Sequence, residues 1–326
     1  MSDLAPSIIV NHSSPVTYHY WVYGLRIRSN LEIPALLPYH SIHHPAPEFG
    51  QNCDVIVNFD ETIADFDAYG SPHPLYVDLG LSKTVLFDRN VGLFILTQGK
   101  EVWIQPSVEK NLNQIRLYIL GTVLTVLMYQ RSSLILHGSA VEIGNQVIGV
   151  IAPSGGGKSS TAAALFRRGH RLLSDDAIAI TRHHNGYSVN PGYPRLKISE
   201  IMATHLNCDG LEIIDRHPLS DEVSFDARPQ FADRALPLKQ IYVLGIDDNC
   251  GIIPISEKEA LFNMMTNSLP TMWMQHHNPE QFQQCTEFIK VIPFYQLNRS
   301  ENLADMDQLI TMLEDHALDQ LATGIS

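Results

Sequence analysis

The sequence predicts an α/β protein with a mixed sheet, in which a smaller β-rich N-terminal domain over residues 1–108 precedes a larger domain over residues 109–326. Two observations predict this division. Short runs of β-branched and aromatic residues, separated by turn signals, fill the first third, which is typical of hairpins. Beyond residue 108, apolar residues recurring every three or four positions alternate with short apolar runs, a pattern typical of helices packed on strands. The 326 residues, 44% of them hydrophobic, are enough for one large domain or two ordinary ones.

Charge and hydropathy exclude several classes of protein. The chain has 22 Lys and Arg against 35 Asp and Glu, a net charge of −13, which argues against a nucleic-acid partner. The longest mostly apolar run, Leu117–Tyr129, is shorter than the roughly 20 residues of a membrane helix, and no basic segment precedes an apolar one at the N-terminus. The four cysteines form no Cys-x-x-Cys pair, which favours a reducing compartment. We therefore expect a soluble, cytoplasmic protein without a membrane partner.

The N-terminal domain is predicted to be a meander of strands. Its first two strands are joined by a loop rich in Pro and His over residues 34–47. Three histidines this close could bind a metal, but no carboxylate or Cys completes a ligand spacing, so a solvated loop is the simpler interpretation. The predicted strands are Tyr20–Ile27, Cys53–Phe59, Thr84–Phe87, Gly92–Thr97 and Glu101–Gln105.

The larger domain is predicted to begin with a helix and then to alternate. Gly144-Asn145 and Asn185-Gly186 each separate two apolar runs and so predict hairpins. Ser256 and Glu259 form a capping-box pattern that opens a helix reaching Asn267. Residues 203–236 have little periodicity and are predicted to be a long loop or a small excursion. The other predicted elements are helix Val108–Gln130, strands Leu134–Ile143 and Gln146–Ile151, helix Lys158–Arg168, strands Ala177–Arg182, Tyr187–Val189 and Gln240–Ile246, helix Phe282–Lys290, strand Pro293–Leu297 and helix Leu303–Leu318.

The most informative segment is the glycine-rich run from Ala152 to Ser159. It fits the pattern G-x-x-x-x-G-K-[ST] except that Ala152 replaces the first Gly, and it lies between an apolar strand and a helix. Glycines let backbone N–H groups converge on phosphate oxygens at the positive end of the helix. Lys158 can reach the β- and γ-phosphates, and the Ser159 hydroxyl can ligate Mg²⁺. The segment predicts ATP and Mg²⁺ as cofactors, the alternative being a flexible glycine loop. The predicted nucleotide contacts are Ser154, Gly155, Gly156, Gly157, Lys158, Ser159 and Ser160.

A pair of acids, Asp175 and Asp176, follows 17 and 18 residues after Lys158. Two adjacent carboxylates can divide the work of phosphoryl transfer, since one can ligate Mg²⁺ while the other accepts a hydroxyl proton. An ordinary acidic turn is the alternative, which the neighbouring glycine-rich loop disfavours.

Three further residues are candidates for the same site. His137 ends an apolar strand, where a histidine is either a satisfied core residue or a polar group of a site. Arg195 and Lys197 lie on one side of the chain if their segment is extended, and two cations could neutralise charge near a triphosphate. A solvated basic pair is the alternative for these two residues.

These features, in this order, resemble the HPr kinase family, bacterial serine kinases with a phosphoenolpyruvate-carboxykinase-like nucleotide site. The resemblance covers about residues 109–326 and centres on His137-Gly138, the run from Ser154 to Ser159, and the run from Arg168 to Asp176. Tyr23-Gly24-Leu25-Arg26-Ile27 and Pro191-Gly192-Tyr193-Pro194-Arg195 look more like a divergent branch of the family that includes lasso-peptide tail kinases. The arginine-rich loop that HPr kinases use for the reverse, dephosphorylating reaction is not seen.

The resemblance implies an ATP-dependent serine kinase that acts on a peptide or protein, including a lasso precursor peptide. It implies that Asp175 is the general base, that Asp176 and Ser159 hold Mg²⁺, that Lys158 binds the phosphates and that His137 lies near the γ-phosphate. The N-terminal domain would then recognise the substrate. A small-molecule kinase and a nucleotide-binding regulator that transfers little phosphate stay open as alternatives, although the intact Asp pair disfavours the regulator. The sequence also leaves a homo-oligomer open.

Overall fold

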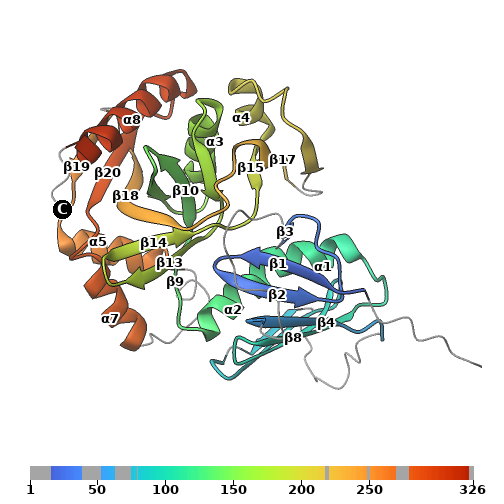
Figure 1. Ribbon diagram of the computed structural model, residues 1–326. Coiled ribbons are helices and arrows are strands. Elements are labelled where there is room, and N and C mark those ends of the chain that lie inside the picture. Colours follow the sequence, from blue (N-terminus) through green and yellow to red (C-terminus); the bar gives the residue numbers. More distant parts are fainter. Residues whose placement is uncertain are drawn as a thin grey trace, which may run out of the picture.

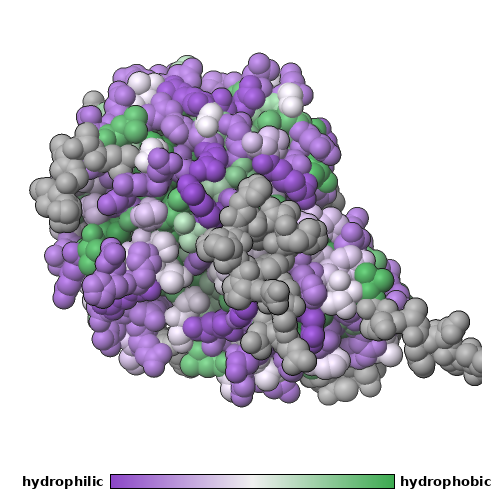
Figure 2. All heavy atoms as spheres, in the orientation of Figure 1, coloured by the Kyte–Doolittle hydropathy of each residue, from purple (hydrophilic) through white to green (hydrophobic). Residues whose placement is uncertain are grey.

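The computed structural model describes residues 16–38, 53–62, 75–78, 80–216, 220–247, 250–268 and 279–322. Within them the protein is a mixed α/β fold with two large sheets and one small sheet, so the predicted fold class is confirmed (Figure 1). The histidines of the predicted Pro- and His-rich loop lie outside the described residues. The face seen in Figure 2 is mainly hydrophilic with scattered apolar residues, which is ordinary for a protein surface.

The first sheet is built from residues 18–106, and its central strands were predicted. The predicted strand Tyr20–Ile27 is wrong, because the chain turns at Tyr23 (φ 53°) and Gly24 (φ 80°) and forms a hairpin instead. Two consecutive residues with positive φ match the right-handed twist of paired strands, so a two-residue turn fits here. The strand order is β3-β1-β2-β4-β8-β7-β6-β5. The strands are β1 (Tyr18–Val22), β2 (Leu25–Ser29), β3 (Leu37–Pro38), β4 (Val55–Phe59), β5 (Leu75–Asp78), β6 (Lys83–Asp88), β7 (Gly92–Thr97) and β8 (Glu101–Pro106).

One long helical segment follows the first sheet. It consists of α1 (Leu112–Tyr118), a π-helical turn η3 (Ile119–Val123) and α2 (Leu124–Gln130). It begins four residues later than predicted, because the Asn111 side chain caps the backbone N–H of Gln114. Among the described residues, this is the one segment long and apolar enough to cross a membrane, and half of that window is buried in the protein. Its apolar residues share one core with the first sheet, so it packs as a core helix.

The second sheet has nine strands and carries the glycine-rich loop. The predicted strand Leu134–Ile143 is wrong, because it breaks at His137 and its halves pair with different partners, β9 with β13 and β10 with β11 and β12. The main order is β12-β10-β11-β18-β14-β13-β9, and β20 joins β18 to β19. The strands are β9 (Leu134–Leu136), β10 (Gly138–Ile143), β11 (Gln146–Ile151), β12 (Arg171–Ser174), β13 (Ile178–His183), β14 (Gly186–Asn190), β18 (Leu236–Ile246), β19 (Gly251–Pro254) and β20 (Phe294–Arg299).

Helices cover both faces of this sheet (Figure 1). Val150 of β11 shares a core with α3 and α8, whereas the next residue, Ile151, shares a core with α5 and α7. Because successive residues of a strand point to opposite faces, β11 is buried on both sides. The predicted capping box of Ser256 and Glu259 is confirmed at the start of α5. The helices are α3 (Lys158–Arg167), α5 (Glu257–Thr266), α7 (Pro279–Phe288), the 3₁₀ turn η5 (Leu303–Asp305) and α8 (Met306–Ala322).

Of the two predictions for residues 203–236, the structure has the small excursion and not the long loop. They contain the end of α4 (Glu200–His205), strands β16 (Ile213–Arg216) and β17 (Glu222–Asp226), and the 3₁₀ turn η4 (Arg228–Gln230). Together with β15 (Arg195–Ser199), the two strands form a third sheet in the order β15-β17-β16. β16 is largely exposed and β17 pairs with a strand more than 20 residues earlier, so local periodicity gave no signal.

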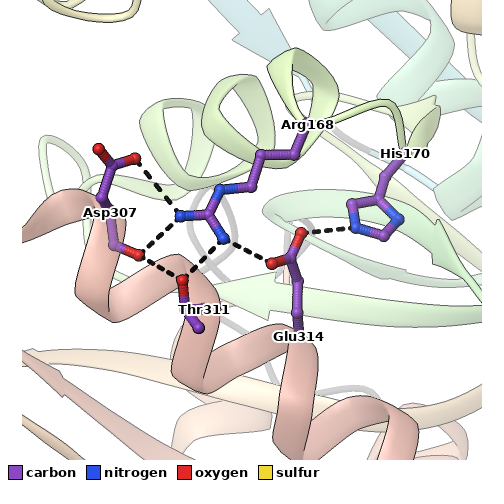
Figure 3. Close-up of polar contacts among 5 residues, drawn as sticks. All are labelled: Arg168, His170, Asp307, Thr311 and Glu314. Carbon is purple, nitrogen blue, oxygen red and sulfur yellow. Dashed lines mark hydrogen bonds and ion pairs between the residues drawn. The ribbon is translucent and has the colours of Figure 1, made fainter.

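A polar network connects the C-terminal end of α3, the helix that follows the glycine-rich loop, to α8 (Figure 3). Arg168 donates hydrogen bonds to Thr311 Oγ1 (2.9 Å), Glu314 Oε2 (2.6 Å) and the carbonyl oxygen of Asp307 (2.7 Å). His170 Nε2 lies 2.8 Å from Glu314 Oε1. This part of the run that resembles HPr kinases therefore anchors α3 on α8.

Glu314→Ala is expected to lower the free energy of unfolding by about 1–2 kcal/mol, because it leaves two half-buried donors, Arg168 and His170, without their shared acceptor. Denaturant unfolding of the wild type and the variant measures this difference. Asp307→Ala is the matched control on the same helix, since that side chain is 96% exposed and should contribute almost nothing. Equal losses for the two variants would contradict the network.

Candidate functional site

A cavity of about 280 Å³ lies beside the N-terminal end of α3. It collects most of the residues that the sequence predicts for the site and adds two acids, Asp221 and Glu222, that were not predicted. Gly156, Asp175 and Arg195 were predicted but do not line it. The lining residues are His137, Ser154, Gly155, Gly157, Lys158, Ser159, Ser160, Asp176, Lys197, Ile198, Ser199, Asp221 and Glu222.

The glycine-rich loop has a backbone that other residues could not adopt. Gly157 stands at the N-cap of α3 with φ 101°, so the helix begins without a side-chain cap. The first N–H groups of such a helix are free to bind an anion. A Cβ on Gly156 would lie 2.6 Å from the Cβ of Ala152. The departure from the motif at residue 152 is therefore compatible with the loop only because residue 156 is Gly.

Lys158 is the buried cation of the cavity. Its Nζ donates hydrogen bonds to the carbonyl oxygens of Ala152 (2.9 Å) and Pro153 (3.1 Å). Burial lowers the pKa of this amine, while the carboxylates of Asp175 and Asp176 act in the opposite direction. Lys158 is thus directed along the glycine-rich loop, where a phosphate group would replace the carbonyl contacts.

The two adjacent acids occupy different positions. Asp175 is only 4% exposed, and it accepts hydrogen bonds from Ser139 Oγ (2.6 Å) and the backbone N–H of Lys197 (3.2 Å). The nearby Ser159 hydroxyl acts to lower the pKa of Asp175. The side chain of Asp176 is 43% exposed and lines the cavity. Asp176 has φ 75°, in the left-handed region that Asp tolerates better than most residues. Asp175 is therefore buried and bonded to Ser139 and the Lys197 backbone, and Asp176 faces the cavity.

Burial and the neighbouring charge of Asp176 raise the pKa of Asp175 from 3.8 to about 6. Between these two values the folded state binds a proton more tightly than the unfolded state. The contribution of Asp175 to stability is therefore fully present below about pH 4 and is lost as the pH rises toward 6.

The unfolding free energy of Asp175→Asn minus that of the wild type is expected to rise by about 3 kcal/mol as the pH rises from 4 to 7. The reason is that Asn cannot ionise, whereas Asp175 loses its proton in this range. Denaturant unfolding of the metal-free wild type and variant at several pH values measures the difference between them. Taking that difference removes the contributions of the other acids. A difference that stays constant over this pH range would contradict the raised pKa.

His137 is held as a neutral ring. Its Nδ1 lies 3.0 Å from the carbonyl oxygen of Asp176, and its backbone N–H donates to the carbonyl oxygen of Asn267. A carbonyl can only accept, so Nδ1 carries the proton and Nε2 is the acceptor nitrogen of the neutral ring. Burial and then the charge of Lys158 lower the pKa of His137. The ring can therefore accept a hydrogen bond in the cavity and fixes the backbone of Asp176.

Arg195 and Lys197 lie on the same face of β15, as predicted, but they line different cavities. Lys197 Nζ is 3.8 Å from Asp176 Oδ2 and 3.7 Å from Glu222 Oε2. Arg195 donates to Ser224 Oγ (2.8 Å) and lies in a second cavity. Lys197 is thus positioned for the predicted nucleotide contact, and Arg195 is not.

Arg299 is a site residue that sequence reasoning missed. It ends β20, and its Nη2 donates to the carbonyl oxygen of Gly156 at 3.4 Å. Its Nε is buried and has no hydrogen-bond partner within the part of the chain that the structure describes. β11, β18 and β20 are parallel, so their carboxyl ends share one edge of the sheet with the glycine-rich loop. Only knowledge of that pairing could have placed Arg299 here.

The N-terminal hairpin also reaches the site. The backbone N–H of Tyr23 donates to the carbonyl oxygen of Pro191 at 2.7 Å, and the rings of Tyr23 and Tyr193 lie edge to face at 6.4 Å. A Cβ on Gly192 would lie 2.5 Å from Ser174 Oγ and 3.0 Å from the Tyr23 ring. The two segments that resemble the divergent branch are therefore in contact, next to the Asp pair.

The oxygen atoms in the cavity fit a magnesium–nucleotide better than a metal ion alone. Ser159 and Asp176 line the cavity, and the buried Asp175 lies close to Ser159. Over the described residues, no three His, Cys, Asp or Glu side chains are grouped as a metal site. Mg²⁺ in nucleotide sites takes one or two protein ligands together with phosphates and water, so the small ligand set is sufficient.

No protein-family model matches the chain. It is 24% identical over 145 residues to the HPr kinase/phosphorylase of Mycoplasmopsis pulmonis, covering 41% of this chain and 46% of that one. It is 29% identical over 134 residues to that of Chloroherpeton thalassium (36% and 38%) and 38% identical over 80 residues to that of Halalkalibacterium halodurans (24% of each).

Among solved structures, it is similar to the HPr(Ser) kinase/phosphatase from Coxiella burnetii, with 12% identity, a TM-score of 0.33, and coverage of 57% of this chain and 97% of that one. The chain spans less than half the length of the curated relatives named above. The sequence relatives confirm the predicted resemblance to HPr kinases, and the lasso-peptide branch stays a prediction.

Proposed function

We propose that this protein is an ATP-dependent kinase that transfers the γ-phosphate to the hydroxyl of a Ser in a peptide or protein. The observation that carries the proposal is the cavity at α3, where Lys158 and the glycine-rich loop meet a carboxylate, Asp176, on the same wall. A phosphate-binding loop and an accessible acid within one cavity are the two parts that hydroxyl phosphorylation needs. The sequence relatives, named as kinases, support the same reaction class.

In the proposed site, the loop amides and Lys158 bind the β- and γ-phosphates. Mg²⁺, when bound with the nucleotide, would neutralise the charge that develops on the transferred group, and Ser159 and Asp175 would hold it. We assign the metal to Asp175 because its carboxylate lies close to Ser159, the other proposed ligand. The sequence assigned the metal to Asp176 and the base to Asp175, and the proposal exchanges these roles.

Asp176 is the proposed base. Its carboxylate accepts the proton of the acceptor hydroxyl as the new oxygen–phosphorus bond forms, and the bond to the β-phosphate oxygen breaks to release ADP. His137 fixes the backbone of Asp176 by a hydrogen bond to its carbonyl oxygen. Lys197 Nζ lies 3.8 Å from the same carboxylate and holds it toward the cavity.

Arg299 supplies a further cation next to the loop in this proposal. Arg299→Gln is expected to lower the rate of phosphoryl transfer about tenfold, because one charge-assisted contact to the phosphates is lost. Steady-state assays at saturating ATP measure the rate. Arg182→Gln is the control and should behave as the wild type. It removes an exposed arginine of β13 that pairs with Glu287 of α7. Equal rates for the wild type and Arg299→Gln would remove Arg299 from the site.

The test of the proposed function is transfer of labelled phosphate. The protein is incubated with radiolabelled ATP, Mg²⁺ and hydroxyl-bearing peptides, and the mass gain of each peptide is read. Label on Ser peptides is the expected result. Label on small metabolites alone would favour the small-molecule kinase, and tight ATP binding without any label would favour the regulator.

The finer assignments belong to the same proposal. A lasso precursor peptide is one candidate acceptor, supported by the contact between the Tyr23 and Tyr193 segments. Residues 1–108 would contribute to acceptor recognition and residues 109–326 to nucleotide binding and catalysis. A cytoplasmic location is supported by the four free cysteines, of which Cys208 and Cys285 are buried.

A further inference from the structure

A second cavity, of about 310 Å³, lies where α1 meets the third sheet. Its floor is apolar, since Ile33 and Leu120 are almost fully buried there. Three arginines stand on its wall, Arg116 of α1, Arg195 of β15 and Arg228 of η4. The cavity therefore combines buried apolar residues with three guanidinium groups, which suits a ligand that is both anionic and partly aliphatic.

The charge of this cavity contrasts with the charge of the chain. The whole protein has a net charge of −13, whereas the wall has three arginines and one acid, Asp215. Asp226, outside the wall, pairs with Arg228 at 3.1 Å, so even with it three cations face two anions. A cluster of cations in a cleft attracts anions over the surrounding negative surface.

Each guanidinium group donates a hydrogen bond to a neutral acceptor, and two of them also pair with a carboxylate, Arg195 with Asp215 and Arg228 with Asp226. Arg116 Nε donates to the carbonyl oxygen of Glu32 (2.8 Å), Arg228 Nη2 to that of Pro34 (2.8 Å), and Arg195 Nε to Ser224 Oγ (2.8 Å). These bonds fix the orientation of each group without neutralising it. Each guanidinium has five N–H donors, so donors are left for a carboxylate.

A single strand joins this cavity to the phosphate-binding cavity. Arg195 lines the first and Lys197 lines the second, and both belong to β15. Residues two apart on one face of a strand are only about 7 Å apart. An extended ligand bound along β15 could therefore reach both cavities within a few residues.

We propose that this cavity binds an acidic segment of the peptide acceptor and sets the distance from that segment to the phosphorylated Ser. The carboxylate contacts the three arginines, an aliphatic side chain lies on the floor formed by Ile33 and Leu120, and the Ser hydroxyl extends along β15 to Asp176. The proposal rests on the proposed kinase function. It gives Arg195 a role in acceptor binding in place of the nucleotide contact that the sequence predicted.

The test uses peptides of seven residues with a central Ser and aliphatic neighbours, carrying an uncharged fluorophore. One peptide has two Glu residues and an amidated C-terminus, the second has Gln in their place, and the third is the Gln peptide with a free C-terminal carboxylate. Fluorescence anisotropy without ATP measures their affinities. We expect the Glu peptide to bind about tenfold more tightly than the amidated Gln peptide, with the difference shrinking at high salt.

The variants are chosen to act in opposite directions. Arg195→Gln is expected to abolish the preference for the Glu peptide, and Arg228→Gln to reduce it, provided thermal unfolding shows that each variant is folded. Asp215→Asn removes the acid that competes for Arg195, 3.4 Å away, and should strengthen Glu-peptide binding. Arg182→Gln lowers the net charge equally, away from this cavity, and should have no effect.

Equal affinities of wild-type protein for the Glu and Gln peptides, amidated or free, would overturn the proposal. Weaker binding of the Glu peptide to Asp215→Asn would overturn it too. A structural disturbance alone would lower the affinity of both Arg195→Gln and Asp215→Asn, whereas the proposal predicts opposite changes. Tight binding of the third peptide alone would assign the site to a chain-terminal carboxylate and support it. Lys158→Ala should bind the Glu peptide in preference to the Gln peptide as the wild type does, because Lys158 does not line this cavity. If the wild-type protein discriminates between the peptides but transfers no phosphate, the kinase function is rejected and the acidic-peptide site is kept.

Discussion

Asp176→Asn is expected to lower the rate of phosphoryl transfer by about 10²–10⁴-fold while leaving ATP affinity close to that of the wild type. The variant keeps the shape of the side chain and removes the proton acceptor on the cavity wall. In the proposed site the nucleotide contacts lie on the loop amides, Lys158 and Ser159, so ATP binding is not expected to depend on this carboxylate. Single-turnover transfer and calorimetric ATP titration measure the two quantities separately.

Two companion variants make this result specific. Asp221→Asn changes another acid on the same wall and should leave the rate within a few-fold of the wild type, because it lies outside the Asp pair. Asp175→Asn should raise the Mg²⁺ concentration for half-maximal activity, since an amide is a poorer ligand for a hard cation. If Asp175→Asn instead loses transfer at saturating Mg²⁺ and Asp176→Asn shows the changed Mg²⁺ dependence, the assignment made from the sequence is correct.

Lys158→Ala is expected to weaken ATP binding by about 1.5–3 kcal/mol and to reduce transfer at least as strongly as the loss of the base. The amine is buried at the loop, where a charge-assisted contact to phosphate is shielded from water. Calorimetric titration with ATP measures the affinity. Lys258→Ala, on the exposed first turn of α5, is the control for loss of one lysine. Equal ATP affinities for Lys158→Ala and Lys258→Ala would refute the phosphate-loop assignment.

The parts of the site that could be predicted are local in the sequence. The loop and the Asp pair lie within 25 consecutive residues that form strand, loop, helix and strand, so spacing alone brought them together. Arg299 and Glu222 could not be predicted, because strand pairing with distant segments brings Arg299 to the glycine-rich loop and Glu222 to the cavity. The opposite orientations of Asp175 and Asp176 depend on the positive φ of Asp176, which no composition pattern indicates.

The secondary structure shows the same difference between features set by local sequence and features set by distant strand pairing. The hairpin at Gly144-Asn145 was predicted because turn residues specify it directly, and both residues have positive φ. His137 was predicted to end an apolar strand, yet one strand was also predicted through it, because apolar residues continue on both sides. What separates β9 from β10 is the choice of partner strands, and that choice is a property of the whole sheet.

The contact of Tyr23 with Pro191 and Tyr193 has a consequence for how the protein can be divided. Tyr23 and Tyr193 are 5% and 6% exposed, and they lie beside the strand end that carries the Asp pair. A chain starting at residue 109 would present this aromatic surface and the apolar face of α1 and α2 to water. Cutting or grafting at that boundary is thus expected to yield aggregates rather than a smaller working enzyme. Recombination or an engineered fusion would therefore have to transfer the first and second sheets together.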